Sequence, residues 1–305
     1  ALMDEGNTIP FIARYRKEMH GAMDDTTLRN LETRLTYLRN LQERRDEVKK
    51  SIENQGKLTE ELSAAIDTAA TMTEVEDLYR PYKQKRRTRG SMAREKGLEP
   101  LAKAIFAQDG SDPAVLAKAY IDSEKGVNTL EEALQGANDI IAEDLSDDAD
   151  IRKALREVVL RKGTFVCKAA EEAPEDGVYK LYYDFSQSIS RLLDHQILAM
   201  NRGEKEGILK PAVTLAGNDG FAVVRRAALK PVLNISTFVR DAADDAYERL
   251  IFPSIQREVR SELSDRAYEG AIRNFALNLK PLLMQPPVKG FVTMGLDPGY
   301  RNGCK

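Results

Sequence analysis

The sequence lacks several residue types and motifs on which common classes of enzyme depend. Its 305 residues contain no tryptophan, two cysteines and two histidines. Two cysteines do not make a disulfide framework, and so low a content suits a reducing compartment. The chain has no GxxxxGK[ST], GxGxxG or CxxC motif, so nucleotide-binding and zinc sites have no motif support. We therefore predict no cofactor and no metal site.

Long apolar runs and catalytic signatures are also missing. No apolar run approaches the ~20 residues that a membrane-spanning helix needs, so we predict no membrane contact. His20 and His195 are far apart in the sequence, and no nucleophile signature accompanies either. His195 follows Asp194 in a helical stretch and is expected to be structural. No catalytic residue is predicted, and we do not expect an enzyme.

What stands out is one strongly basic segment, from Leu78 to Gly97. The chain as a whole has a formal net charge of −3, yet from Tyr79 onward this segment has Glu95 as its one acidic residue. Its basic residues are Arg80, Lys83, Lys85, Arg86, Arg87, Arg89, Arg94 and Lys96. Such a concentration usually reflects contact with a polyanion. Nucleic acid fits better than a small phosphate ligand, because its affinity is built from many equivalent phosphate contacts.

The residues predicted to bind nucleic acid lie in the first half of this segment. Tyr79 and Tyr82 flank the cations and could stack on unpaired bases. The alternative is a solvated segment, or one that pairs with acidic helices of the same chain. The predicted site consists of Arg80, Lys83, Lys85, Arg86, Arg87, Arg89, Tyr79 and Tyr82.

The spacing of apolar residues predicts a mainly α protein, a multi-helix scaffold with a small β insertion. The longest expected helix runs from residue 25 or 26 to about residue 54, with a leucine stripe that includes Leu35. A short helix follows Gly6, with Phe11, Ile12 and Tyr15 expected to face inward. This helix–glycine–helix pattern gives helix-turn-helix character. The runs 208–215 and 221–226 predict a β-hairpin.

Smaller signals mark where individual elements begin and end. Thr73 is predicted to cap the helix that leads into the basic segment, and Thr129, with Glu132, to cap a helix from residue 130 to 145. Gly90 is predicted to break that segment, and Pro253 to kink or break a long helix between residues 236 and 283. The acidic run 143–150 is expected to be helix-end and loop acids, because it lacks the ligand ladder of a calcium loop.

Near the end of the chain, an apolar strand is predicted to end at Asp297, directly before a Pro-Gly turn. Carboxylates at such strand ends hold Mg²⁺ in phosphoryl-transfer sites. A single carboxylate cannot hold two metal ions, so a nuclease is kept only as a rival hypothesis.

Several long stretches of the chain have the character of family signatures: NTIPFIARYRKE at 7–18, DLYRPYK at 77–83 with KRRTR at 85–89, RGEKEG at 202–207 and RLIFPSIQRE at 249–258. These stretches resemble signatures of the bacterial Tex transcription accessory proteins, a family related to the eukaryotic elongation factor Spt-six. The last residues, MGLDPGYRNGCK from Met294 to Lys305, are similar to the opening of the YqgF domain of that family, which has an RNase H-like fold.

The resemblance implies a cytoplasmic, nucleic-acid-binding transcription accessory factor, of which this chain is the helical scaffold portion. Its implied partners are nucleic acid, with RNA favoured over DNA, and RNA polymerase or other transcription machinery. The family places its main nucleic-acid binding in an OB-fold that this chain lacks. Two alternatives stay open: an RuvC-like metal-dependent nuclease that uses Asp297, and a protein-interaction scaffold without nucleic-acid contact.

On this basis we divide the chain into four segments. The chain opens as if cut from a helix and ends as a new strand begins, so we expect a fragment of a longer protein. The segments are an N-terminal helical region (1–78), a basic loop with a central helical region (79–202), a β-hairpin followed by helices (203–288) and the first strand of a truncated RNase H-like domain (289–305).

Overall fold

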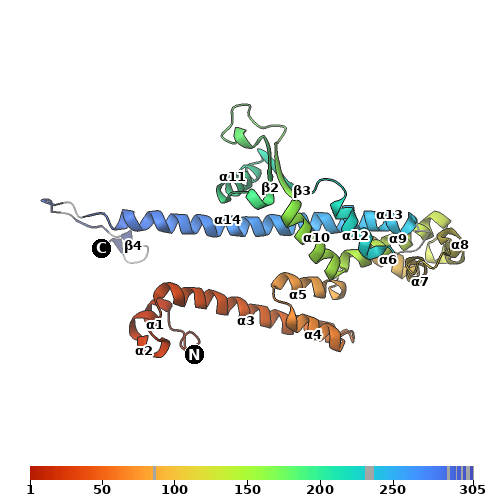
Figure 1. Cartoon of the computed structure of the whole chain (residues 1–305), viewed down its shortest axis with the longest axis horizontal. Coiled ribbons are helices and arrows are strands. Elements are labelled where there is room, and N and C mark those ends of the chain that lie inside the picture. The colour runs from red at the N-terminus through yellow and green to blue at the C-terminus, as the bar shows by residue number, and fades with distance from the viewer. Residues whose placement is uncertain are drawn as a thin grey trace. The chain divides into compact units, whose positions relative to one another are not determined.

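The protein is mainly helical with a small β-sheet, as the sequence predicted (Figure 1). The computed structural model describes residues 1–84, 87–230, 237–286, 289–292, 294–296, 298–299 and 303–304. Within these, the chain forms two compact units, Ala1–Thr164 with Val213–Val259, and Phe165–Ala212 with Arg260–Lys305. The four segments drawn from the sequence stay a prediction. None of the described helices is both long enough and apolar enough to cross a membrane.

The first unit begins with helices that pack at the two ends of a long one. Figure 1 shows α1 and α2 at one end of α3, and α4 and α5 at the other. Asp24 caps α3 and Thr59 caps α4, because their side chains accept the N–H groups of Thr27 and Leu62. The helices are α1 (Ile9–Tyr15), α2 (Lys17–His20), α3 (Asp25–Glu53), α4 (Glu60–Thr68) and α5 (Met72–Tyr79).

The short helix predicted after Gly6 is α1, but the residues before Gly6 form a turn and not a helix. Gly6 N–H donates to the Met3 carbonyl at 3.1 Å, and Gly6 has a positive φ. Ile9 and Ile12 are buried, whereas Phe11 and Tyr15, which were expected to face inward with Ile12, are exposed. The helix-turn-helix character of this region stays a prediction.

The cap of α5 was predicted two residues too late. Thr71, not Thr73, accepts the N–H of Glu74, and the Glu74 carboxylate accepts the N–H of Ala70 at 2.7 Å. This reciprocal pair satisfies two backbone donors at the start of the helix. The sequence contains two overlapping Thr-x-x-Glu patterns, Thr71 to Glu74 and Thr73 to Glu76. The earlier pattern forms the cap, because its threonine and its glutamate each accept a backbone N–H.

The leucine stripe of α3 forms a core at both ends and not in the middle. Leu28 packs with Ile9 and Ile12, while Leu41, Val48 and Ile52 pack with residues of α4 and α5. Leu31 and Leu38 remain 45% and 44% exposed, and Leu35 is half-buried. A helix of 29 residues is about 43 Å long, so short helices packed at its two ends leave its centre uncovered.

Around α9 the first unit builds its central core. This helix contacts α6, α7, α8 and α13, and it buries small residues such as Ala133 and Ala137, which let its neighbours approach. Thr129 caps it, as the sequence predicted, by accepting the Glu132 N–H. The helices of this core are α6 (Arg89–Glu95), α7 (Glu99–Phe106), α8 (Pro113–Ala117), α9 (Leu130–Asp147), α10 (Ala149–Lys162), α12 (Asp219–Ala228) and α13 (Thr237–Asp245).

The predicted hairpin is wrong in its second half. Residues 208–215 do contain a strand, β3 (Leu209–Thr214), but residues 221–226 lie within the helix α12. The short apolar run also fits a helix, because Val224 and Ala228 are four residues apart and both are buried. A Cβ on Gly220 would overlap the Tyr247 ring, so close packing against that ring helps to decide between strand and helix.

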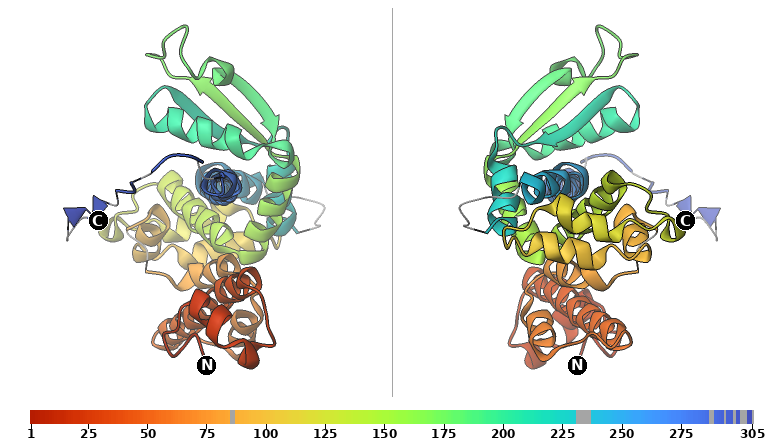
Figure 2. Two further views of the ribbon diagram at one scale, coloured as in Figure 1. Left: turned by 90° about the vertical axis from the view of Figure 1, so that its left-hand side faces the viewer. Right: turned by 90° about the vertical axis from the view of Figure 1, so that its right-hand side faces the viewer.

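The strand β3 pairs instead with β1 (Thr164–Ala169), in a sheet whose order is β2-β1-β3. Ala169 N–H donates to the Tyr183 carbonyl, next to β2 (Asp184–Ser188), and Ala170 N–H donates to the Ile208 carbonyl at 2.8 Å. Since each bond joins the end of β1 to the start of its neighbour, both pairings are antiparallel. Figure 2 shows α11 (Asp194–Lys205) along one face of these strands, where Gly203 admits the side chain of Leu209.

Pro253 does disturb the helix in which it lies. The π-helical turn Ala246–Ile251 comes directly before α14 (Phe252–Leu283), which has Pro253 as its second residue. A proline lacks an N–H, and its ring clashes with the carbonyl four residues earlier, here that of Arg249. The wider π turn relieves this clash without ending the helix.

Near the C-terminus, the described residues of the predicted strand at 291–296 have no β pairing. Phe291 is mostly exposed and Val292 is fully exposed. The described strands of this region are β4 (Pro298–Gly299) and β5 (Gly303–Cys304), which pair antiparallel. Asp297 lies outside the described residues, and the RNase H-like domain stays a prediction.

The uneven burial of α3 leads to a test of its packing. Leu41→Ala should lower the free energy of unfolding by about 2–5 kcal/mol, the usual cost of emptying a leucine site in a core. Leu31→Ala, in the same stripe but exposed, should change it by less than about 0.5 kcal/mol. Urea denaturation of both variants measures the difference. Equal losses would show that the centre of α3 is also covered.

Candidate nucleic-acid interface

The basic segment is ordered where the structure describes it. After α5 the chain forms a 3₁₀ turn, η1 (Arg80–Tyr82), and Thr88 then caps α6. The Thr88 hydroxyl accepts the Ser91 N–H at 3.0 Å, and the Ser91 hydroxyl accepts the Thr88 N–H at 2.8 Å. Lys85 and Arg86 lie outside the described residues. The segment is therefore held at both ends by helix termini.

The prediction that Gly90 breaks this segment is wrong, because Gly90 is the second residue of α6 and is buried. A Cβ at this position would overlap the carboxylate of Glu143 and would lie 3.1 Å from the backbone oxygen of Asp139. The glycine thus serves the close approach of α6 to α9 and not a turn.

Two arginines of the segment are neutralised by acidic residues of α9. Arg94 Nη1 lies 2.6 Å from Glu143 Oε2, and its other nitrogen pairs with Asp144. Arg80 Nε lies 3.3 Å from Asp147 Oδ1, and burial, followed by the nearby charge of Arg152, lowers the pKa of Arg80. The alternative that the segment pairs with acidic helices of its own chain therefore holds for these two cations.

Three other cations of the segment point to solvent. Lys83 is 60% exposed and lies 4.0 Å from Glu76, while Arg87 is 74% exposed and lies 3.7 Å from Glu95. Arg89 is exposed and has no ion pair within the described part of the chain. Because exposed ion pairs contribute about 0–1 kcal/mol, all three side chains remain available to an external anion.

The tyrosines predicted to stack on bases take part in the core instead. Tyr79 and Tyr82 pack against the cluster that joins α3 to α5. The Tyr79 hydroxyl lies 3.0 Å from Ser51 Oγ, and the Arg44 guanidinium lies 5.5 Å from its ring centroid. Leu78 and Tyr79 continue the apolar face of α5, and this periodicity was the available signal that the Tyr79 ring is partly buried.

A buried ionic network lies directly before the basic segment. Arg152 of α10 is fully buried; its Nε donates to Asp77 Oδ1 at 2.7 Å, and it also pairs with Glu258. Arg156 donates to both Asp77 and Glu258 at 2.9 Å. The Ser254 hydroxyl donates to Glu258 at 3.0 Å. This network joins the stretch 77–83 to the stretch 249–258, two of the family signatures in the sequence.

Arg152 and Arg156 were not predicted from the sequence. They lie four residues apart on α10, so they share one side of the helix. Arg152 also follows Ile151 directly within a helix whose buried apolar residues are Ile151, Leu155 and Val159. An arginine so close to the apolar stripe was the available signal that one charge is buried.

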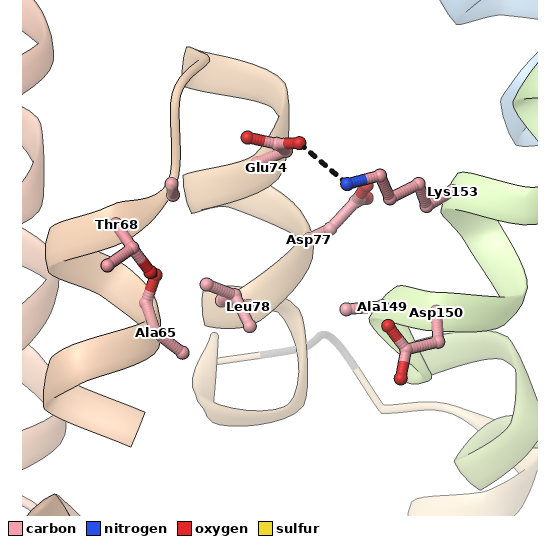
Figure 3. Close-up of a pocket in the computed structure, with 9 residues that line it drawn as sticks. Ala65, Thr68, Glu74, Asp77, Leu78, Ala149, Asp150 and Lys153 are labelled. Carbon is pink, nitrogen blue, oxygen red and sulfur yellow. Dashed lines mark hydrogen bonds and ion pairs between the residues drawn. The ribbon is translucent and has the colours of Figure 1, made fainter. Parts of the chain in front are cut away.

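A separate depression between α4, α5 and α10 has a volume of about 350 Å³. Figure 3 shows Glu74 and Lys153 facing each other across it, and their Oε1 and Nζ atoms are 3.0 Å apart. Asp77 of α5 and Asp150 of α10 also line it. Among its lining residues Lys153 is the single cation, and Glu74 already pairs with it. This depression therefore offers no surplus positive charge to a nucleic acid.

Few residues here have the properties of a catalytic group. Burial raises the pKa of the Cys167 thiol to about 11, so the thiol stays protonated and unreactive near neutral pH. His20 Nε2 lies 3.1 Å from the Ile12 backbone oxygen, and His195 is exposed on α11. In the part of the chain that is described, no group of three or more His, Cys, Asp or Glu residues could hold a metal ion.

Comparison with known families identifies the chain. A model described as Tex-like protein N-terminal domain matches residues 1–53, and one described as Tex central region-like matches residues 108–275. The chain belongs to the Tex family. The region matched by the central model includes α9, α10 and the arginine pair of the buried network.

Relatives of this Tex-family chain occur in bacteria and in animals. Over its full length it is 45% identical to Uncharacterized protein YdcI of Bacillus subtilis and 43% identical to Protein tex of Bordetella pertussis. It is 31% identical to S1 RNA-binding domain-containing protein 1 of Homo sapiens. The chain covers 43%, 40% and 32% of these relatives, less than half of each.

The buried network leads to a prediction about stability. Arg152→Met should lower the free energy of unfolding by about 3–5 kcal/mol, because it leaves Asp77 and Glu258 with less compensation for their charge. Lys153→Met, which removes a 56% exposed partner of Glu74 on the same helix, should cost less than about 1 kcal/mol. Urea denaturation compares the two. Similar losses would mean that Arg152 is no more important than a surface lysine.

Replacing Gly90 by alanine tests the close packing of α6 on α9, because the packing determines whether the change stabilises or destabilises the protein. In an open helix position, Gly→Ala stabilises by roughly 0.5–1 kcal/mol. Here the added methyl group meets Glu143 and the backbone of Asp139, so Gly90→Ala should destabilise by about 1–3 kcal/mol. Thermal unfolding of the variant and the parent chain measures this. A raised melting temperature would contradict the close approach of α6 to α9.

Proposed function

We propose that this chain is the helical scaffold of a transcription accessory factor, and that it contacts nucleic acid through its basic segment. The relatives support the first part, since two carry the names Protein tex and Transcriptional accessory protein Tex. The second part rests on the chain itself. Lys83, Arg87 and Arg89 are exposed, while Arg80 and Arg94 pair with acidic residues.

The proposed contact is with the phosphate backbone. Lys and Arg side chains that meet phosphates position a protein on nucleic acid without reading its sequence. Tyr79 and Tyr82 are left out of the proposed interface, because their packing against the core occupies them. Lys85 and Arg86 remain in the proposal on charge alone. RNA is favoured over DNA, since the human relative is named for an RNA-binding domain.

The wider setting is part of the same proposal. As a transcription accessory factor, the protein would act in the cytoplasm and meet RNA polymerase or other transcription machinery. We propose no catalytic role for this chain. The rival nuclease depends on Asp297, outside the described residues, and the rival protein scaffold would use uncovered apolar surface such as Leu31 and Leu38 on α3.

The test replaces the three exposed cations, Lys83, Arg87 and Arg89, by alanine. Binding of single-stranded RNA, measured by fluorescence anisotropy, should start near ~10⁻⁴–10⁻⁶ M and should weaken equally for different sequences. The slope of log affinity against log salt should flatten by about 0.7 for each phosphate of a single strand that the variant no longer neutralises. The melting temperature should be unchanged, because the three side chains are exposed.

A matched control removes three exposed lysines elsewhere in the first unit: Lys50, Lys103 and Lys118. It lowers the positive charge equally and should leave the salt slope as it is in the parent. Equal weakening by the two triple variants would show that net charge alone governs binding. Unchanged binding by the basic-segment variant would remove that segment from the interface. Parallel titrations with single-stranded and duplex DNA test the preference for RNA.

A further inference from the structure

Arginines from four elements line one cavity in the first unit. Its volume is about 330 Å³, near the lower end of the ~300–1,000 Å³ range of ligand pockets. The hydroxyl residues Thr88 and Ser146 also line it. The four arginines are Arg80 of η1, Arg89 of α6, Arg249 of the π turn and Arg257 of α14.

The acidic residues of this cavity are matched by arginines that do not include Arg89 or Arg257. Arg249 Nη2 lies 3.1 Å from Asp139, and Arg80 Nε lies 3.3 Å from Asp147. The third acid, Glu143, pairs with Arg94, which is not in the lining. Arg89 and Arg257 are both exposed, and neither has an ion pair in the described residues. The lining holds four arginines and three carboxylates, and Arg89 and Arg257 are the two lining arginines that are not paired with these carboxylates.

The π turn and Gly90 bring this lining together. The π turn places Arg249 so that its guanidinium binds Asp245 through two nitrogens, with Nε at 2.9 Å and Nη2 at 2.5 Å, while it also reaches Asp139. Single π turns occur often at functional sites. Gly90, which also lines the cavity, lets the start of α6 and therefore Arg89 approach α9.

We propose that this cavity binds a phosphate group of the nucleic-acid backbone, with Arg89 and Arg257 as its direct ligands. The inference rests on the proposed function and deepens it, because Arg89 belongs both to the basic segment and to the cavity. The planar guanidinium groups match phosphate oxygens in geometry as well as charge. Arg249 and Arg80, held by their carboxylates, form the polar wall behind the phosphate.

Arg257→Gln tests the cavity without touching the basic segment. It should weaken the binding of single-stranded RNA by about tenfold, the usual effect of removing a charge-assisted hydrogen bond. The salt slope should flatten by about 0.7, and Arg257→Lys should recover part of the affinity. Arg161→Gln is the matched control, an exposed arginine of α10 without an ion pair in the described chain. Circular dichroism melts establish that each variant is folded.

The outcomes separate this inference from the proposed function. If Arg257→Gln binds RNA as Arg161→Gln does, the cavity is not a phosphate site, even when the triple variant of the basic segment loses affinity. If Arg257→Gln and Arg89→Ala each weaken binding and the double variant Lys83→Ala/Arg87→Ala does not, the cavity stands and the wider basic surface is not part of the interface.

A second measurement distinguishes a backbone phosphate from a free one. Inorganic phosphate and uridine monophosphate compete with labelled RNA at constant ionic strength, set with chloride. A backbone site predicts that both compete only weakly, and less against Arg257→Gln than against the parent. If inorganic phosphate displaces RNA at concentrations near the RNA dissociation constant, the cavity is a site for a free anion and the backbone assignment is overturned.

Discussion

The architecture of the first unit depends on one buried arginine. Arg152 has no exposed surface, and its charge is balanced by Asp77 and Glu258 from two other helices. Removing an ion from water costs several kcal/mol, so a buried arginine is tolerated only where its partners are close and well oriented. This requirement fixes α5, α10 and α14 relative to each other. It also fixes the start of the basic segment, because Arg80 follows Asp77 by three residues.

Whether a basic residue of this protein is available to a partner therefore depends more on its burial and ion pairs than on its place in the sequence. The basic segment looks uniform along the chain, but Arg80 and Arg94 are matched by acids at the end of α9, and Arg87 and Arg89 are exposed. The acidic run at the end of α9 thus serves partly to hold the segment in place. A count of basic residues overstates the charge available to a partner, and only the exposed fraction can release counterions from a nucleic acid.

Elements were predicted correctly where one local signal acted alone, and wrongly where packing chose between two. The long helix α3, the cap at Thr129 and the disturbance at Pro253 were predicted, because capping and proline sterics act within a few residues. The apolar spacing of the run 221–226 fits both a strand and a helix, and packing against Tyr247 favours the helix. For the candidate site, the sequence shows where basic residues concentrate, but which of them are paired depends on acids about 50 to 70 residues away.

The positions that break local rules lie close to one another in space. A glycine within α6, a proline in the continuous helical run that passes from the π turn into α14, and the π turn itself are each unfavourable or rare when considered alone. Gly90, Pro253 and Arg249 all line the same arginine-rich cavity. Natural sequences depart from locally consistent choices mostly where function requires it. The coincidence of three such departures at one cavity is a reason, independent of charge, to expect a ligand there.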